Sequence, residues 1–197
     1  MNNLRFTTYL TSNIGTDQAV IEQLLSHCSI REFKKGEFLL RQGEKCRYSF
    51  FVESGLLRQF SIDEKGKEHI IQFAPENWFM SDRESVYFDR PSSYFMQALE
   101  DTVTFLLDEN LFLELSKSDT AFLEFNNRLL HNHIRHLQRR ITQLQSATAE
   151  ERYLDFIRMY PDLLLRVPQI FIASYLGITP ESLSRVRKEL AGKNHRM

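Results

Sequence analysis

The chain has 197 residues, of which 42% are hydrophobic and 26% are charged, and its net charge at pH 7 is −1. These values are those of a globular protein with room for one good-sized domain and a small one, which excludes disordered and fibrous classes. Two cysteines, no apolar run of membrane-spanning length and no signal pattern exclude a disulfide framework and favour a cytoplasmic protein without membrane contact.

The small net charge hides an asymmetry along the chain. Residues 1–127 hold 13 Lys+Arg and 20 Asp+Glu, whereas residues 128–197 hold 12 and 6. An acidic body with a basic end is typical of a sensor or scaffold joined to a nucleic-acid-binding region. A chance asymmetry is the alternative interpretation.

The first predicted element is a helix over residues 17–27, with Asp17 near its start. From about residue 30 to 108 the pattern changes to short, alternating, aromatic-rich segments separated by glycine-containing turns. This spacing predicts an antiparallel β-sandwich or barrel, with a hairpin tip at residues 63–67. The predicted strands are residues 38–42, 48–52, 56–62, 69–73, 94–99 and 102–107.

A helical period succeeds the strands, from about Asp119 to Leu144, and it has two apolar faces. Phe122, Phe125 and Leu129 form one strip, which we expect to pack on the β-domain of the same chain. The other face repeats in heptads and favours a parallel homodimer, with packing onto the chain's own body as the alternative. This seam consists of Leu123, Asn127, Leu130, Ile134, Leu137, Ile141 and Leu144.

Residues 145–148 interrupt the long helix. Thr148 and Glu151 have the spacing of a capping box, so a new helix is predicted from Ala149 to about Met159. A capped break between two helices is a candidate hinge between the long helix and the C-terminal region.

Residues 169–188 have the pattern of a helix–turn–helix. Gly177 occupies the turn, where positive φ is required, and Thr179 and Pro180 are a good N-cap and first residue for the second helix. Ala173 lies where the second helix passes close. The apolar residues expected in a shared core are Ile172, Leu176, Ile178, Leu183 and Val186.

The second helix of this pair places polar groups on one face. Side chains of these types can contact base edges and phosphates, which predicts DNA binding, whereas an ordinary helical hairpin is the alternative. The candidate DNA-binding residues are Thr179, Glu181, Ser184, Arg185, Arg187 and Lys188. For Arg187 a solvated surface charge is an equal alternative to a phosphate contact.

The order of these features resembles the Crp/Fnr family of bacterial transcription regulators over nearly the whole chain. The resemblance depends on Lys35-Gly-Glu37, Gly43-Glu44, Ser54-Gly-Leu-Leu57, the segment beginning Ala149-Glu-Glu-Arg and the helix–turn–helix. It implies an α+β fold with a cyclic-nucleotide-binding-like β-roll (a jelly roll). The expected domains are a β-roll effector domain (residues 1–118), a dimerisation helix (119–146) and a DNA-binding domain (147–197).

The resemblance also assigns roles in the recognition helix. Its Glu181, Ser184 and Arg185 are similar to the Glu-x-x-Ser-Arg set of the Fnr branch. This implies that Glu181 accepts from a cytosine amino group, Arg185 contacts a guanine and Ser184 contacts a neighbouring base. The implied partners are double-stranded DNA, a second copy of the chain, an unidentified small-molecule effector and RNA polymerase.

The β-roll departs from the family's nucleotide pocket, which uses Gly-Glu for the ribose and Arg-Ser for the cyclic phosphate. Residues 78–94 contain no Gly-Glu, and Ser92-Ser93 stands where Arg-Ser is expected. A buried phosphate without a cationic partner is costly, so we do not expect cyclic AMP binding in the usual manner. The candidate effector-pocket residues are Ser81, Asp82, Arg83, Arg90, Ser92 and Ser93.

Other sites and classes are weakly indicated. On a helix, His133 and His136 lie near each other and His131 points away, so we predict no metal site. No Cys-x-x-Cys-His or Gly-x-Ser-x-Gly occurs, and we expect no haem, no iron–sulfur cluster and no enzyme activity. The remaining alternatives are a ligand- or protein-binding β-roll whose DNA-binding end has degenerated, and a cupin-type metalloenzyme. The short segments around the helix–turn–helix predict a reduced or absent β-hairpin wing.

Overall fold

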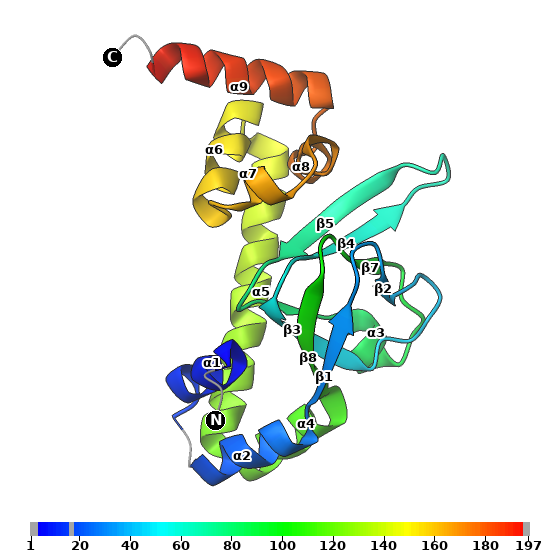
Figure 1. Cartoon of the computed structure of the whole chain (residues 1–197), viewed down its shortest axis with the longest axis vertical. Coiled ribbons are helices and arrows are strands. Elements are labelled where there is room, and N and C mark those ends of the chain that lie inside the picture. Colours follow the sequence, from blue (N-terminus) through cyan, green and yellow to red (C-terminus); the bar gives the residue numbers. More distant parts are fainter. Residues whose placement is uncertain (1–3, 16–17, 195–197) are drawn as a thin grey trace. The chain divides into compact units, whose positions relative to one another are not determined.

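The computed structural model describes residues 4–15 and 18–194 (Figure 1), so Asp17, the predicted helix start, lies outside the described residues. The chain divides into two compact units. The first unit comprises Met1–Ile62 and Ile71–His131, and the second unit comprises Asp63–Ile70 and Asn132–Met197. The long helix α5 (Thr120–Ser146) contributes residues to both units.

The β-strands form two four-stranded sheets, in the orders β1-β8-β3-β6 and β2-β7-β4-β5. The registers of β1 with β8, β3 with β8 and β6, and β7 with β2 and β4 are all antiparallel, which confirms the predicted antiparallel β-domain. The strands are β1 (Ser29–Phe33), β2 (Phe38–Leu40), β3 (Tyr48–Ser54), β4 (Leu57–Ile62), β5 (Glu68–Ala74), β6 (Phe79–Met80), β7 (Phe95–Ala98) and β8 (Thr102–Asp108). Of these, β1 and β6 were not among the predicted segments.

Strands β3 and β8 are buried on both faces, and alternate side chains enter different cores. Phe50 and Leu106 pack in one apolar cluster together with residues of both sheets. Phe51 and Phe105, which are register partners, pack in a second cluster that also contains helical residues. Because successive strand residues point to opposite faces, one apolar run supplies both cores.

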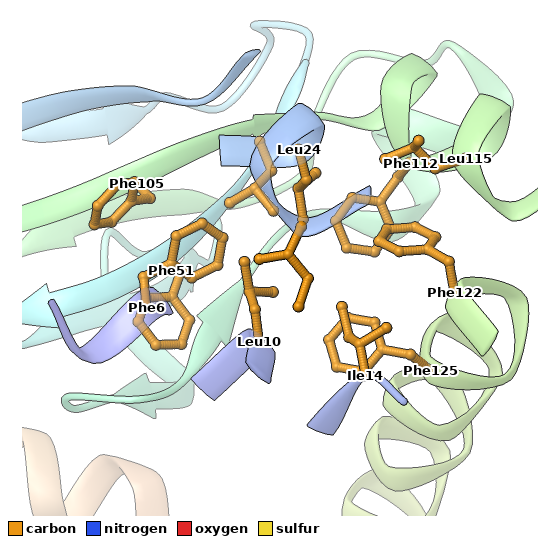
Figure 2. Packing of buried hydrophobic residues seen from close by; sticks show 12 residues of the cluster. Phe6, Leu10, Ile14, Leu24, Phe51, Phe105, Phe112, Leu115, Phe122 and Phe125 are labelled. Atoms are coloured by element: carbon orange, nitrogen blue, oxygen red, sulfur yellow. The ribbon is translucent and has the colours of Figure 1, made fainter. Parts of the chain in front are cut away.

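The second cluster, shown in Figure 2, joins helices to the first sheet. Phe6 and Leu10 come from α1 (Arg5–Asn13), and Leu24 comes from α2 (Gln18–His27). Phe122 and Phe125 of α5 are fully buried here, and Leu129 packs against them, so the predicted own-chain strip is confirmed. Aromatic rings dominate the cluster, with the Phe6 and Phe51 centroids 4.8 Å apart.

Helices α1, α3 (Arg83–Phe88) and α4 (Glu109–Ser118) of the first unit were not predicted. The start of α1 explains why. The side chain of Glu53 accepts hydrogen bonds from the backbone N–H groups of Arg5 (2.7 Å) and Phe6 (2.9 Å). A capping side chain that lies so far away in the sequence leaves no local signal, because capping rules compare neighbouring residues.

The second unit is helical after Asn132, and no strand occurs there among the described residues. Its helices after α5 are α6 (Ala149–Met159), α7 (Leu163–Arg166), α8 (Gln169–Leu176) and α9 (Pro180–Asn194). The predicted capping box is present, with Glu151 N donating to Thr148 Oγ1 (3.2 Å) and Thr148 N donating to Glu151 (2.7 Å). The short helix α7 was not predicted.

The β4–β5 hairpin tip also belongs to the second unit. Asp63 N donates to the Lys67 carbonyl (3.0 Å), and Gly66 adopts φ +78, as the predicted turn requires.

Candidate nucleic-acid interface

Helices α8 and α9 and the turn between them form the predicted helix–turn–helix. Gly177 adopts φ +66 as the C-cap of α8. The backbone N–H groups of Gly177 and Ile178 donate to the carbonyls of Ser174 (3.1 Å) and Ala173 (3.0 Å), which ends the helix. A side chain at position 177 would also meet Leu144 of α5, at 3.0 Å from its Cδ2 atom.

The start of α9 is capped as the sequence predicts. Ser182 N donates to Thr179 Oγ1 at 3.2 Å, and Pro180 occupies the first helical position, where no N–H is needed. The pKa of Glu181 is lowered by hydrogen bonding to its own backbone amide and to the Thr179 side chain. Glu181 is therefore ionised at neutral pH and accepts hydrogen bonds only.

The two helices share a small apolar core. Ala173 is fully buried, which allows the close approach expected there, whereas Ile178 is half-buried. The core residues with almost no exposure are Ile172, Leu176, Leu183 and Val186. These positions match the predicted core.

The opposite face of α9 is polar and exposed. Glu181, Ser184, Arg185 and Lys188 all lie on it and are solvent-exposed, as is Arg187. Because positions 181, 184, 185 and 188 are separated by three or four residues, they share one helix face. The geometry leaves this face accessible for contact with a nucleic-acid groove.

Several polar contacts in the second unit had no signal in the sequence. The hydroxyl of Ser174 on α8 accepts from the backbone N–H of Ile70 (3.0 Å) and donates to the carbonyl of Glu68 (3.1 Å), which joins α8 to β5. Lys193 near the end of α9 pairs with Glu150 at the start of α6 (2.8 Å). Neither pair is close in sequence, so no spacing rule finds them.

The candidate effector-pocket residues are only partly brought together. Asp82 caps α3 through Ser85 N (3.2 Å) and accepts a hydrogen bond from Ser92 Oγ (2.6 Å), and both Asp82 and Ser92 are buried. The Oγ atom of Ser81 is buried without a hydrogen-bond partner among the described residues.

The two arginines of this set have other partners. Arg83 lies 3.3 Å from buried Glu109, which also accepts from Ser49. Arg90 is exposed and lies 3.8 Å from Glu84, and Ser93 is exposed as well. Both guanidinium groups are thus paired with glutamates. Ser92 stands where the resemblance places an arginine that holds the cyclic phosphate, and its hydroxyl is hydrogen-bonded to the carboxylate of Asp82.

The predicted dimer seam is exposed along the whole of α5. Its six apolar members are 37–55% exposed, and Asn127 is exposed too. Large apolar side chains in such a row are unusual on a free surface. They are Leu123, Leu130, Ile134, Leu137, Ile141 and Leu144.

Within residues 4–15 and 18–194, no group of three or more His, Cys, Asp or Glu side chains has the arrangement of a metal site, and His131 is exposed. The same residues contain no helix that is long and apolar enough to cross a membrane. Burial raises the pKa of Cys46, and it raises that of Cys28 to about 12, so both thiols are protonated at neutral pH.

Comparison with known proteins agrees with this architecture. Residues 30–119 match the family described as a cyclic nucleotide-binding domain. The chain is 32% identical to the transcriptional activator protein Anr of Pseudomonas aeruginosa, over 79% of this chain and 68% of Anr. It is 27% identical to electron transport regulator A of Shewanella oneidensis, over 79% of this chain and 66% of that regulator.

Among solved structures, FixK2 from Bradyrhizobium japonicum is similar with a TM-score of 0.74 and 19% identity, over 85% of this chain and 86% of FixK2. That likeness shows the shared fold. A cyclic-nucleotide-binding-like β-domain, a long helix and a helix–turn–helix define a transcription regulator. The chain belongs to the Crp/Fnr family of transcription regulators.

Proposed function

We propose that this Crp/Fnr regulator is a homodimer, not an enzyme, and that it binds a two-fold-symmetric DNA site with one α9 helix in each half-site. The observation that carries the proposal is the exposed polar face of α9, which lies opposite its buried Leu183 and Val186. On this face Glu181 is ionised, and Arg185 can donate two parallel hydrogen bonds to a guanine.

The exposed seam of α5 supports the dimer. Its leucines and isoleucines repeat in heptads, and a second copy of the helix would remove them from water. In a parallel pair the two C-terminal regions lie at the same end, so two α9 helices can enter successive major grooves, about 34–36 Å apart.

The dimer is tested by sedimentation of the double variant Ile134→Asp with Ile141→Asp. We expect a monomer that loses symmetric DNA binding, because charges would face each other in the seam. Thr142→Asp is the matched control, since Thr142 is exposed on the same helix outside the seam. A wild-type monomer in solution would refute the proposal.

DNA binding is tested by in vitro selection of duplex sites, followed by affinity measurements on the selected site. Arg185→Ala should cost about 1–3 kcal/mol of specific binding and relax the preference for guanine at one position. Arg187→Ala should weaken binding evenly across sequences and reduce the salt slope by about 1. Unchanged affinity in the Arg185 variant would contradict its base-reading role. If the wild type shows no salt-dependent binding to any duplex, the DNA-binding end is degenerate.

We also infer that the β-roll does not bind cyclic AMP in the family's usual manner. The support is the Asp82–Ser92 hydrogen bond, which occupies the position where the resemblance places a phosphate-binding arginine. Calorimetric titration of the full-length protein with cyclic AMP should give no micromolar or tighter binding. The other expected partners are an unidentified small-molecule effector and RNA polymerase, and the expected location is the cytoplasm.

A further inference from the structure

The connection between α5 and α6 is only two residues long, because α5 ends at Ser146 and α6 begins at Ala149. The capping box of Thr148 and Glu151 fixes how α6 starts but not the direction of α6 relative to α5. Other side chains must set that direction. In the second unit, the buried carboxylate of Asp155 and the half-buried guanidinium of Arg140 make such contacts.

The carboxylate is Asp155 of α6, whose side chain is 6% exposed. It accepts hydrogen bonds from Arg139 and from Gln143, both on α5, and lies 3.5 Å from Arg158 on its own helix. Positions 139 and 143 are one helical turn apart and therefore face the same way. A buried carboxylate is costly without such partners, so Asp155 favours the arrangement in which α6 stays against this face of α5.

The guanidinium belongs to Arg140, the neighbour of Arg139. It donates to the backbone carbonyl of Tyr175 on α8 and lies over the Tyr175 ring, 3.6 Å from its centroid. The Tyr175 ring in turn packs against Phe156 of α6, with centroids 5.5 Å apart. Consecutive arginines of α5 thus bind two different helices, α6 and α8, which fixes an orientation and not only a contact.

We propose that Arg139, Arg140 and Asp155 are positioning residues that set the spacing of the DNA half-sites. They hold the helix–turn–helix at one angle to the last turns of α5. This inference rests on the proposed homodimer, in which α5 lies along the two-fold axis. In such a dimer the angle between α5 and α9 determines the separation of the two recognition helices, whereas Glu181 and Arg185 determine which bases are read.

A structural role and a positioning role give different results when spacing is varied. The test uses duplexes with the selected half-sites separated by the wild-type optimum and by one or two base pairs more or less. The variants are Asp155→Asn and Arg139→Gln in the full-length chain. Arg139 is 56% exposed, so its substitution tests the proposal even where Asp155→Asn fails to fold. Arg135→Gln is the matched control, because Arg135 is an exposed residue of α5 one turn earlier.

We expect the wild type and the control to prefer one spacing strongly. Asp155→Asn and Arg139→Gln should reduce the ratio of affinities for optimal and shifted spacings by about fivefold or more, as expected for residues in one hydrogen-bond network. Base preferences within each half-site should stay unchanged. A uniform loss of affinity with the same spacing profile would overturn the proposal and leave these residues a structural role alone.

Amide hydrogen exchange separates failure of this inference from failure of the proposed function. If the wild type binds no symmetric duplex, the proposed function is wrong and the half-site assignment falls with it. The junction itself is then tested by exchange across residues 145–152 in the free protein. Faster exchange in Asp155→Asn than in Arg135→Gln would support the claim that Asp155 fixes the junction between α5 and α6. Equal exchange in the two variants would refute that claim.

Discussion

The two compact units of this chain differ in the size of their apolar cores and in how their helices are joined. The first unit has two apolar clusters that contain buried phenylalanines, such as Phe51 and Phe105 in one and Phe33 and Phe50 in the other. The second unit has a small core beneath α8 and α9. Polar contacts of Asp155 and Arg140 also join its helices, and Ser174 joins α8 to β5. Apolar packing is strong but non-directional, whereas hydrogen bonds fix angles.

This difference fits the task proposed for each unit. A β-domain that carries the dimer helix needs stability above all. A unit that presents a recognition helix to DNA needs a defined orientation, which a few directional contacts supply at little cost in size. The comparison predicts large losses of stability from apolar truncation in the first unit and smaller losses in the second.

The largest effect is expected for Phe122→Ala. Phe122 is fully buried among Phe112 and Phe125, so its truncation should leave a cavity and lower the free energy of unfolding by about 3–5 kcal/mol. Chemical denaturation measures the loss, and hydrogen exchange should show it in the first unit. Leu113→Ala in the same unit is the control, since Leu113 is 44% exposed and should cost much less. Equal losses for the two variants would show that the aromatic cluster does not stabilise the first unit.

The positions of these two kinds of contact also decide what could be predicted. The strip of Phe122 and Phe125, the strands and the helix–turn–helix core follow from periodicity, because apolar residues at a fixed spacing identify a buried face. Turn glycines and caps such as Gly177 and Thr148 follow from local backbone rules. These signals placed most of the fold and the exposed face of α9.

The sequence could not predict contacts between polar residues that are distant along the chain. Glu53 caps α1 from 48 residues away, and Asp155 meets Arg139 across a helix break. Such pairs have no period, and a buried Asp looks the same in sequence as an exposed one. The sequence likewise could not predict that Asp82 and Ser92 bond to each other while Arg83 and Arg90 pair with glutamates, because this depends on the direction of each side chain.

A smaller effect is expected for Gly177→Ala in the second unit. An alanine at φ +66 costs about 1–2 kcal/mol, and its Cβ would lie 3.0 Å from Leu144 Cδ2, so the Leu144 side chain must also move slightly. The midpoint temperature of thermal unfolding and the affinity for the selected DNA site should both decrease. Gly192→Ala is the control: it lies in α9 with open space around it and should be neutral or stabilising by about 0.5–1 kcal/mol. A Gly177 variant as stable as the control would show that the turn does not fix this unit.

The smallest effect is the pH dependence that His136 gives the second unit. Burial lowers the pKa of His136, and His133, Arg140 and Arg139 lower it further, while Asp155 opposes them. Its folded-state pKa is therefore below the unfolded value of about 6.5. At pH 7.5 the ring is neutral in both states. As the pH falls below about 6.5, the unfolded chain takes up the proton first. The free energy of unfolding therefore decreases, by at most about 1.4 kcal/mol per pH unit.

Urea unfolding at pH 7.5 and 5.5 measures this effect as a difference between proteins, since other groups titrate in the same range. His136→Gln should lose less stability than the wild type on acidification, and the control His131→Gln, at an exposed position of α5, should behave like the wild type. If all three proteins lose the same amount, His136 does not contribute to the pH dependence. A difference confined to His136→Gln would instead show that the half-buried imidazole near Arg139 and Arg140 makes the second unit sensitive to acid.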